Sequence, residues 1–225
     1  MALELAAHAL HAGDEHQLWL LDADAVRSVG DLDPRGIPVR GLRRRRGLDL
    51  GYPARLRRAL NEVEADAIHA HNDSALVYSA WALSPMARRP RLIATYHNLS
   101  AHDTWASRWL ARRAARRADA VVCVSNDLAQ RLRRSGWLER ASVIGNGVDL
   151  RRFAPRSAGG TWRARWNVHP QALLIGCVAR LAPSKRHKDL IDAAKSANAR
   201  GLRTHLVFIG EGPERASLRH APVAR

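Results

Sequence analysis

The sequence predicts an α/β fold made of two domains, each with a parallel sheet. Seven short apolar runs rich in branched residues alternate with segments rich in Ala, Leu and Arg that have helical spacing. Hydrophobicity within the runs is continuous rather than alternating, which indicates strands buried on both faces. Strands and helices in alternation predict right-handed crossovers, with helices that cover the sheet.

The expected elements follow in order along the chain. A first helix stops at Gly13 and precedes strands at 16–22, 65–71, 90–98, 118–126 and 141–147, with helices at 53–64, 74–88, 103–117 and 126–135. Strands at 171–179 and 202–210 flank a helix at 186–200, and a last helix signal starts at Glu214. The first helix has no strand before it, so we expect the N-terminal domain to lack its first strand. Two strands are too few for a doubly wound sheet, so the C-terminal domain is expected to be incomplete.

Residues 151–170 interrupt this alternation. Pro155, Ser157, Gly159 and Gly160 are typical of a linker, and a short helix holding Trp162 and Trp166 follows them. We therefore predict a first domain at 1–150, a linker at 151–170 and a second domain at 171–225.

The composition is strongly basic. Lys and Arg number 37 against 21 Asp and Glu, for a formal charge of +16, which favours an anionic partner unless it reflects a background preference for Arg. Arginines spread over several helices and an aromatic content of 5% count against nucleic acid. An anionic membrane is a candidate partner for Arg43 to Arg46 with Arg55, Arg57 and Arg58, and a solvated loop is the alternative.

Neither cysteine predicts a disulfide or a metal site, since Cys123 and Cys177 both lie in apolar runs. The sequence has no apolar run long enough to span a membrane and no secretory signal. We expect a cytoplasmic protein, with peripheral contact at the inner membrane face.

Polar residues end several of the predicted strands, where parallel sheets bind ligands. His97 could point into a crevice and bond a hydroxyl group, or pack at the sheet edge as a structural residue. His69 and His71 share one face of a strand, but no third ligand at suitable spacing supports a zinc site. Ser125-Asn126 is expected to cap the helix that follows it.

Two further strand ends are candidates for ligand binding. Asn146-Gly147 predicts either a tight turn or a backbone that approaches a ligand closely. Arg180 and Lys185 flank a loop that leads into a helix, where free N–H groups and two cations suit a diphosphate. The alternative is a solvated basic helix start; but Arg186 and Lys188 add cations where they are disfavoured, so we expect a compensating anion. The common glycine-rich nucleotide fingerprints are absent.

The order of the motifs resembles that of the retaining, GT-B-type glycosyltransferases of family 4. The motifs that carry the resemblance are "DAIHAHN", "TYHN", "ADAVVCVSN", "VIGNGVDLRRFAP", "CVARLAPSKRHKDLIDAA" and "LVFIGEGPERASL". Each is weak alone, but the ordered set is specific and covers nearly the whole chain. The resemblance implies two Rossmann-like domains, an acceptor-side one and a donor-binding one, with the active site in the cleft between them.

The resemblance also implies roles for individual residues. Arg180 and Lys185 would hold the diphosphate of a nucleotide-sugar donor, and His97 would contact the donor sugar near the reacting carbon as a catalytic residue. Members of the family usually need no metal, and no cofactor besides the donor is expected. The cleft and interdomain residues would be Asn146, Gly147, Asp149, Gly210, Glu211 and Gly212.

The function implied is transfer of a sugar, with retention, to a glycan or lipid-linked acceptor in envelope polysaccharide or glycolipid synthesis. Two departures from the family pattern matter. Its first strand and glycine-rich loop would lie before Met1, and its pair of glutamates separated by seven residues has no counterpart, because Glu211 and Glu214 are too close together. The alternative is therefore a catalytically inactive remnant or binding fragment of such an enzyme.

Overall fold

A computed structural model of the chain describes residues 15–21, 37–45, 47–98, 104–138, 141–151, 153–154 and 159–219. The chain divides into two compact units, Met1–Val148 (unit 1) and Asp149–Arg225 (unit 2). Each strand pairing within the described residues is parallel, so the predicted α/β class is confirmed. The expected first helix, up to Gly13, lies outside the described residues.

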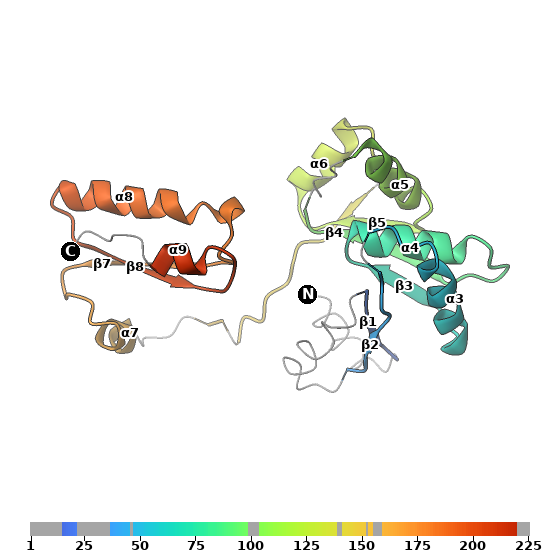
Figure 1. The fold of residues 1–225 in the computed structure, drawn as a ribbon, viewed down its shortest axis with the longest axis horizontal. Helices are drawn as coiled ribbons and strands as arrows, with labels where there is room; N and C mark the ends of the chain where they lie inside the picture. Colours follow the sequence, from blue (N-terminus) through green and yellow to red (C-terminus); the bar gives the residue numbers. More distant parts are fainter. Residues whose placement is uncertain are drawn as a thin grey trace. The chain divides into compact units, whose positions relative to one another are not determined.

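Unit 1 contains two parallel sheets (Figure 1). The larger has the strand order β3 (Ala67–Ala70), β4 (Arg91–Tyr96), β5 (Ala120–Cys123) and β6 (Ser142–Val143). The smaller pairs β1 (Leu18–Leu20) with β2 (Val39–Gly41). The sequence did not predict β2, and the run at 141–147 forms a strand at Ser142–Val143 alone.

The described part of unit 1 contains the helices α3 (Tyr52–Glu62), α4 (Asp73–Leu83), α5 (Trp105–Ala115) and α6 (Asn126–Arg134). The helices α4 and α6 contact strands of the larger sheet, and α3 and α5 pack against α4. Side-chain caps fix where three of these helices begin. Asn72, Thr104 and Ser125 accept hydrogen bonds from the backbone N–H groups three residues later, at 2.8, 3.2 and 3.2 Å. The capping role predicted for Ser125 is confirmed.

The hydrophobic core of unit 1 lies between these helices and the sheet. Leu76 and Leu92 are each 1% exposed, and Ala82 and Cys123 are fully buried. Burying a leucine side chain contributes about 2 kcal/mol. At the start of β4, Asp119 accepts from Arg89 at 2.7 and 2.8 Å and from the Leu92 N–H at 2.7 Å. These bonds lower the pKa of Asp119 to about 2 and join the beginnings of β4 and β5.

Unit 2 is built around two strands, β7 (Leu173–Val178) and β8 (Thr204–Ile209). The helices α7 (Gly159–Arg165), α8 (His187–Ala199) and α9 (Arg215–Arg219) accompany them, with a 3-10 turn at Pro183–Lys185. Within the described part of unit 2, α8 is the helix that runs along the strands (Figure 1). Leu173 and Val178 remain 57% and 78% exposed, so the prediction of strands buried on both faces is wrong here.

No helix within the described residues has the length and apolar character needed to cross a membrane.

Candidate functional site

Three histidines gather at the carboxyl ends of β3 and β4 in unit 1. The parallel register pairs Ala70 with Ala94, which brings the ends of both strands to one edge. There His71 Nδ1 lies 3.1 Å from His97 Nε2, and His69 Nε2 lies 2.7 Å from Thr95 Oγ1. The structure therefore joins His97, the predicted catalytic residue, to a histidine that the sequence placed on a different strand.

The three imidazole rings also lie close together, with His71 stacked on His97 and tilted against His69. The ring centroids of His69 and His71 are 4.2 Å apart, which confirms that they share a face, and those of His71 and His97 are 5.4 Å apart. Burial, helped by the neighbouring histidines, lowers the pKa of His71 to about 4. Burial and His97 likewise lower the pKa of His69. His69 and His71 are thus neutral at neutral pH.

The contact between His71 and His97 restricts what His97 can do. A hydrogen bond between two imidazoles needs an N–H on one ring and a lone pair on the other. It occupies Nε2 of His97 and leaves Nδ1 for a different partner. A hydroxyl group can bond Nδ1 in either tautomer, because it can both donate and accept.

Two buried polar residues, Tyr96 and Asp73, interact beside the histidines, and the sequence reasoning did not predict this contact. Tyr96 ends β4 and is 6% exposed, and Asp73, the first residue of α4, is 9% exposed. Burial raises the pKa of Tyr96, and the nearby Asp73 carboxylate raises it further. An apolar run with one tyrosine gives no signal for this contact, which depends on how α4 packs on β4.

In unit 2 the predicted diphosphate loop follows β7. Backbone N–H groups of Ala182, Lys185 and Arg186 donate to the carbonyl groups of Arg180, Ala182 and Pro183 at 2.9 to 3.0 Å. Lys185 therefore ends a 3-10 turn, and α8 begins at His187, within one residue of the predicted start. Between them, Arg186 has a left-handed backbone, with φ 53° and ψ 41°.

The charges of this loop differ in their surroundings. Arg180 and Lys185 are exposed, and neither forms an ion pair with an acidic side chain within the part of the chain that the structure describes. Arg186 instead pairs with Asp189 at 2.6 Å. Asp189 in the first turn of α8 is thus a partner for Arg186 within the chain, and the anion expected to compensate the other cations stays a prediction. Arg180, Lys185 and Lys188 are the exposed cations of this stretch that have no carboxylate partner among the described residues.

A second loop, at 210–214, packs backbone to backbone against this one. A Cβ atom at Gly210 would lie 1.9 Å from the Ala179 carbonyl oxygen, and one at Gly212 would lie 2.2 Å from that of Leu181. The Leu181 N–H donates to the Glu211 carbonyl at 2.8 Å. The structure thus brings the predicted residues Gly210, Glu211 and Gly212 next to the Arg180 loop, while the Glu211 carboxylate is held by Arg215 at 2.6 Å.

A buried histidine, His187, lies next to the 210–214 loop and was not predicted as a site residue. His187 is 1% exposed, and its Nδ1 lies 3.8 Å from Glu214 Oε2. Its ring meets Phe208 edge to face, with centroids 5.3 Å apart. Among the described residues, neither ring nitrogen has a hydrogen-bond partner. His187 and Glu214 connect the start of α8 to the 210–214 loop.

The segment with Asn146, Gly147 and Asp149 is exposed and irregular. Neither Asn146 nor Gly147 has a positive φ, and a Cβ atom at Gly147 would meet nothing within 4 Å, so the tight-turn alternative is wrong. Asp149 Oδ1 accepts from the Arg151 N–H at 2.9 Å and starts a turn. The ligand role of this segment stays a prediction.

Comparison with known proteins places the chain in a family. Residues 1–152 match the model of Glycosyltransferase Family 4. A GDP-mannose-dependent alpha-mannosyltransferase of Mycobacterium tuberculosis is 30% identical over 187 residues, which is 77% of this chain and 47% of that protein. A GDP-mannose-dependent alpha-(1-6)-phosphatidylinositol dimannoside mannosyltransferase of the same species is 34% identical over 128 residues, or 52% of this chain and 33% of that protein.

A solved structure shares the fold. The crystal structure of Anabaena Alr3699/HepE in complex with UDP matches 97% of this chain and 59% of its own, with a TM-score of 0.77 and 21% identity. The chain spans less than half the length of either mycobacterial relative. Fold and family model agree: the chain belongs to glycosyltransferase family 4 and has the Rossmann-like α/β fold of GT-B enzymes.

Proposed function

We propose that this chain is part of a glycosyltransferase that moves a sugar from a nucleotide diphosphate sugar to a glycan or lipid-linked acceptor, with retention. The observation that carries the proposal is the pair Arg180 and Lys185, exposed on one loop beside the glycine loop at 210–212. A guanidinium fork and a mobile ammonium group suit the two phosphates of such a donor. The loop lies beyond the carboxyl end of β7, where parallel sheets bind ligands.

The names of similar proteins support a nucleotide diphosphate sugar. Two mycobacterial relatives are named as GDP-mannose-dependent, and the Anabaena structure is a complex with UDP. In the proposed reaction Arg180 and Lys185 stabilise the charge that develops on the leaving diphosphate. That role needs no metal ion, and we propose no cofactor besides the donor.

His97 is proposed to contact the donor sugar near the reacting carbon. Its position after β4, with Nε2 bonded to His71, leaves Nδ1 for a sugar hydroxyl. Asn146, Gly147 and Asp149 are proposed to line the donor cleft, together with Gly210, Glu211 and Gly212.

The acceptor is proposed to belong to envelope polysaccharide or glycolipid synthesis, with the protein on the cytoplasmic face of the membrane. Peripheral contact through the arginines at 43–58 is part of this proposal. Arg44 bonds the Gly47 carbonyl at 2.8 Å and Arg55 pairs with Asp49 at 2.6 Å, which leaves Arg43, Arg45 and Arg58 more available to lipid.

Calorimetric titration of the chain with GDP and UDP tests the donor site. We expect measurable binding of one nucleotide, weakened at least about tenfold by Arg180→Ala or Lys185→Ala, since a charge-assisted bond contributes about 1.5–3 kcal/mol. Lys195→Ala is the matched control, because Lys195 lies on α8 and pairs with Asp192 at 3.6 Å. Equal loss in the control, or no binding at all, would contradict the proposal.

Assay of sugar transfer distinguishes the active enzyme from the alternative, an inactive binding fragment. A chain that binds the nucleotide through Arg180 but neither transfers nor hydrolyses the donor is the fragment. In that case the donor site stands and the activity does not.

A further inference from the structure

The helix α5 carries its largest apolar side chains on the wrong side for core packing. Trp105 and Trp109 are 81% and 56% exposed, and their spacing of four residues places them on one face. Its buried residues are Ala111, Ala114 and Ala115. Amphipathic helices of globular domains usually turn large apolar residues toward the core. Here the alanines pack inward and the tryptophans face water.

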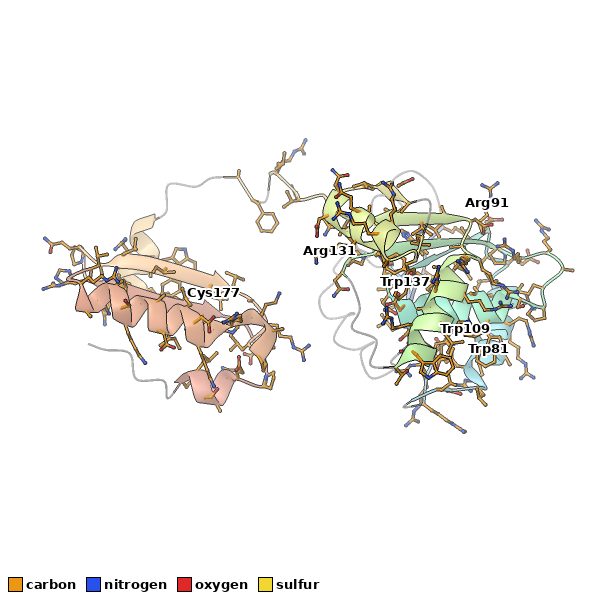
Figure 2. The ribbon with its side chains drawn as sticks, turned by 90° about the horizontal axis from the view of Figure 1, so that it is seen from above. Trp81, Arg91, Trp109, Arg131, Trp137 and Cys177 are labelled. Carbon is orange, nitrogen blue, oxygen red and sulfur yellow. The ribbon has the colours of Figure 1, made fainter. Side chains whose placement is uncertain are left out.

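The neighbouring helix adds a third exposed tryptophan. Trp81, near the end of α4, is 43% exposed. The Arg117 guanidinium donates to Ser84 Oγ at 2.8 Å and so joins the carboxyl ends of α5 and α4. Trp81 and Trp109 lie on the same side of unit 1 (Figure 2). We call Trp81, Trp105 and Trp109, with Arg113 and Arg116, the tryptophan face.

The charged side chains of α5 and of the two residues that follow it are all positive. Residues 104–117 contain no Asp or Glu, and their arginines are Arg108, Arg112, Arg113, Arg116 and Arg117. Arg113 places its guanidinium carbon 5.7 Å from the Trp109 ring centre. Within the described residues, none of these arginines forms an ion pair with a carboxylate.

We propose that the tryptophan face docks the protein on the surface of an anionic phospholipid membrane. Tryptophan rings favour the boundary between head groups and acyl chains, and arginines beside them are attracted to anionic lipid. The arginine stems can lie along the apolar boundary while their charged ends stay among the head groups. The inference rests on the proposed lipid-linked acceptor, for which it gives the docking surface.

Charge argues against a second copy of the chain as the occupant. A two-fold interface would place the same patch on both sides, and so would face the five arginines of one α5 segment with those of the other. Like charges facing across an interface oppose association. An anionic lipid surface satisfies the same arginines.

The loop before α3 is an alternative membrane-docking surface, because it also combines exposed apolar side chains with arginines. Leu48 and Leu50 are 61% and 67% exposed beside Arg43 and Arg45. Its leucines are smaller than the tryptophans and two arginines near it bond within the protein, Arg44 to Gly47 and Arg55 to Asp49. We therefore assign the main contact to α4 and α5, and the arginines at 43–58 add a secondary electrostatic contact.

Cosedimentation of the whole chain with vesicles tests this assignment. Vesicles of phosphatidylglycerol and phosphatidylcholine in equal parts should bind the chain, and pure phosphatidylcholine should bind it far more weakly. The double variant Trp105→Ser/Trp109→Ser should lower partitioning at least about tenfold, because both interfacial rings are lost. Arg113→Gln/Arg116→Gln should lower it about 25-fold on anionic vesicles, since each near-surface arginine contributes about fivefold.

Two control variants define the specificity. Trp162→Ser removes a 49% exposed tryptophan of unit 2 that also has an arginine over its ring, at 5.5 Å. Leu48→Ser/Leu50→Ser removes the apolar side chains of the alternative surface. Both should retain most of the binding. Circular dichroism and thermal unfolding check that each variant is folded.

Several results would overturn the inference. One is vesicle binding that is unchanged in the tryptophan variant. Another is binding that is lost only in Leu48→Ser/Leu50→Ser, and a third is no vesicle binding by the wild type. Self-association that requires the tryptophans would identify a second copy as the partner, and quenching of the tryptophans by a soluble glycan without lipid binding would identify a sugar. The vesicle assay needs no donor, so its failure is distinct from failure of the proposed enzyme.

Discussion

The two units are held together in different ways. Unit 1 packs helices on a four-stranded sheet, and its core residues, such as Leu76 and Leu92, are almost completely buried. Unit 2 has two strands with exposed ends, and its loops are joined by backbone contacts at Gly210 and Gly212. Side-chain packing therefore positions the histidines of unit 1, whereas close backbone approach positions Arg180 in unit 2.

The largest expected effect concerns the backbone contact of unit 2. In Gly212→Ala the new Cβ atom meets the Leu181 carbonyl oxygen at 2.2 Å, so the loops must separate. We expect a loss of at least about 3 kcal/mol in local stability. Hydrogen exchange at the Leu181 and Glu214 amides measures it, since both amides bond across the two loops.

Gly176→Ala is the matched control for this prediction. Gly176 lies in β7, has no positive φ, and a Cβ atom there meets nothing within 4 Å. If the Leu181 and Glu214 amides exchange at the same rate in both variants, the stability of the two loops does not depend on the contact at Gly212.

The next effect tests the packed core of unit 1. The side chain of Leu92 in β4 is 1% exposed. Leu92→Ala leaves a cavity there and should lower the free energy of unfolding by about 3 kcal/mol. Leu173→Ala, in a strand of unit 2 but 57% exposed, should cost less than about 0.5 kcal/mol. Chemical denaturation measures both. Equal costs would remove the contrast between the units.

The smallest expected effect is the pH dependence of the histidine cluster. The unfolded pKa of His71 is near 6.5 and the folded pKa is about 4, so between these values the unfolded state binds more protons. Stability contributed by neutral His71 is present above pH 6.5 and is lost as the pH falls toward 4. Water around the partly exposed ring keeps this loss well below the value of about 3 kcal/mol that the pKa difference alone would give.

His71→Asn should flatten this pH dependence, because asparagine has no proton to gain. Thermal unfolding of the wild type and the variant, measured at several pH values between 4 and 8, checks it. An identical slope in both proteins would show that His71 is not the group responsible.

Much of the fold could be predicted from the sequence, because buried parallel strands leave a clear apolar signal. The strand β4 and the helix α8 fall within two residues of their predicted bounds. The strand β2 was missed, since three residues between Pro38 and Leu42 with an exposed arginine give no continuous apolar run. The strands β7 and β8 of unit 2 are not buried on both faces, although their apolar runs resemble those of the unit 1 strands.

The sequence named individual residues of the candidate site, but their arrangement could not be predicted from it. The sequence named His97 and Arg180, yet the bond from His71 to His97 depends on the register between β3 and β4. The pairing of Arg186 with Asp189 was in reach of helical spacing, because the two residues are three apart at a helix start. The contact of Gly212 with Leu181 joins segments about thirty residues apart and leaves no local signal.

The backbone of Arg186 adds conformational strain to this corner of unit 2. A residue with a side chain costs about 1–2 kcal/mol in the left-handed region, which glycine occupies freely. The ion pair with Asp189 returns little of that cost, because both side chains are largely exposed. Glycine at this position would make the turn more stable and would remove a positive charge next to Lys185. Backbone stability and the positive potential beside Lys185 thus favour different residues at one position.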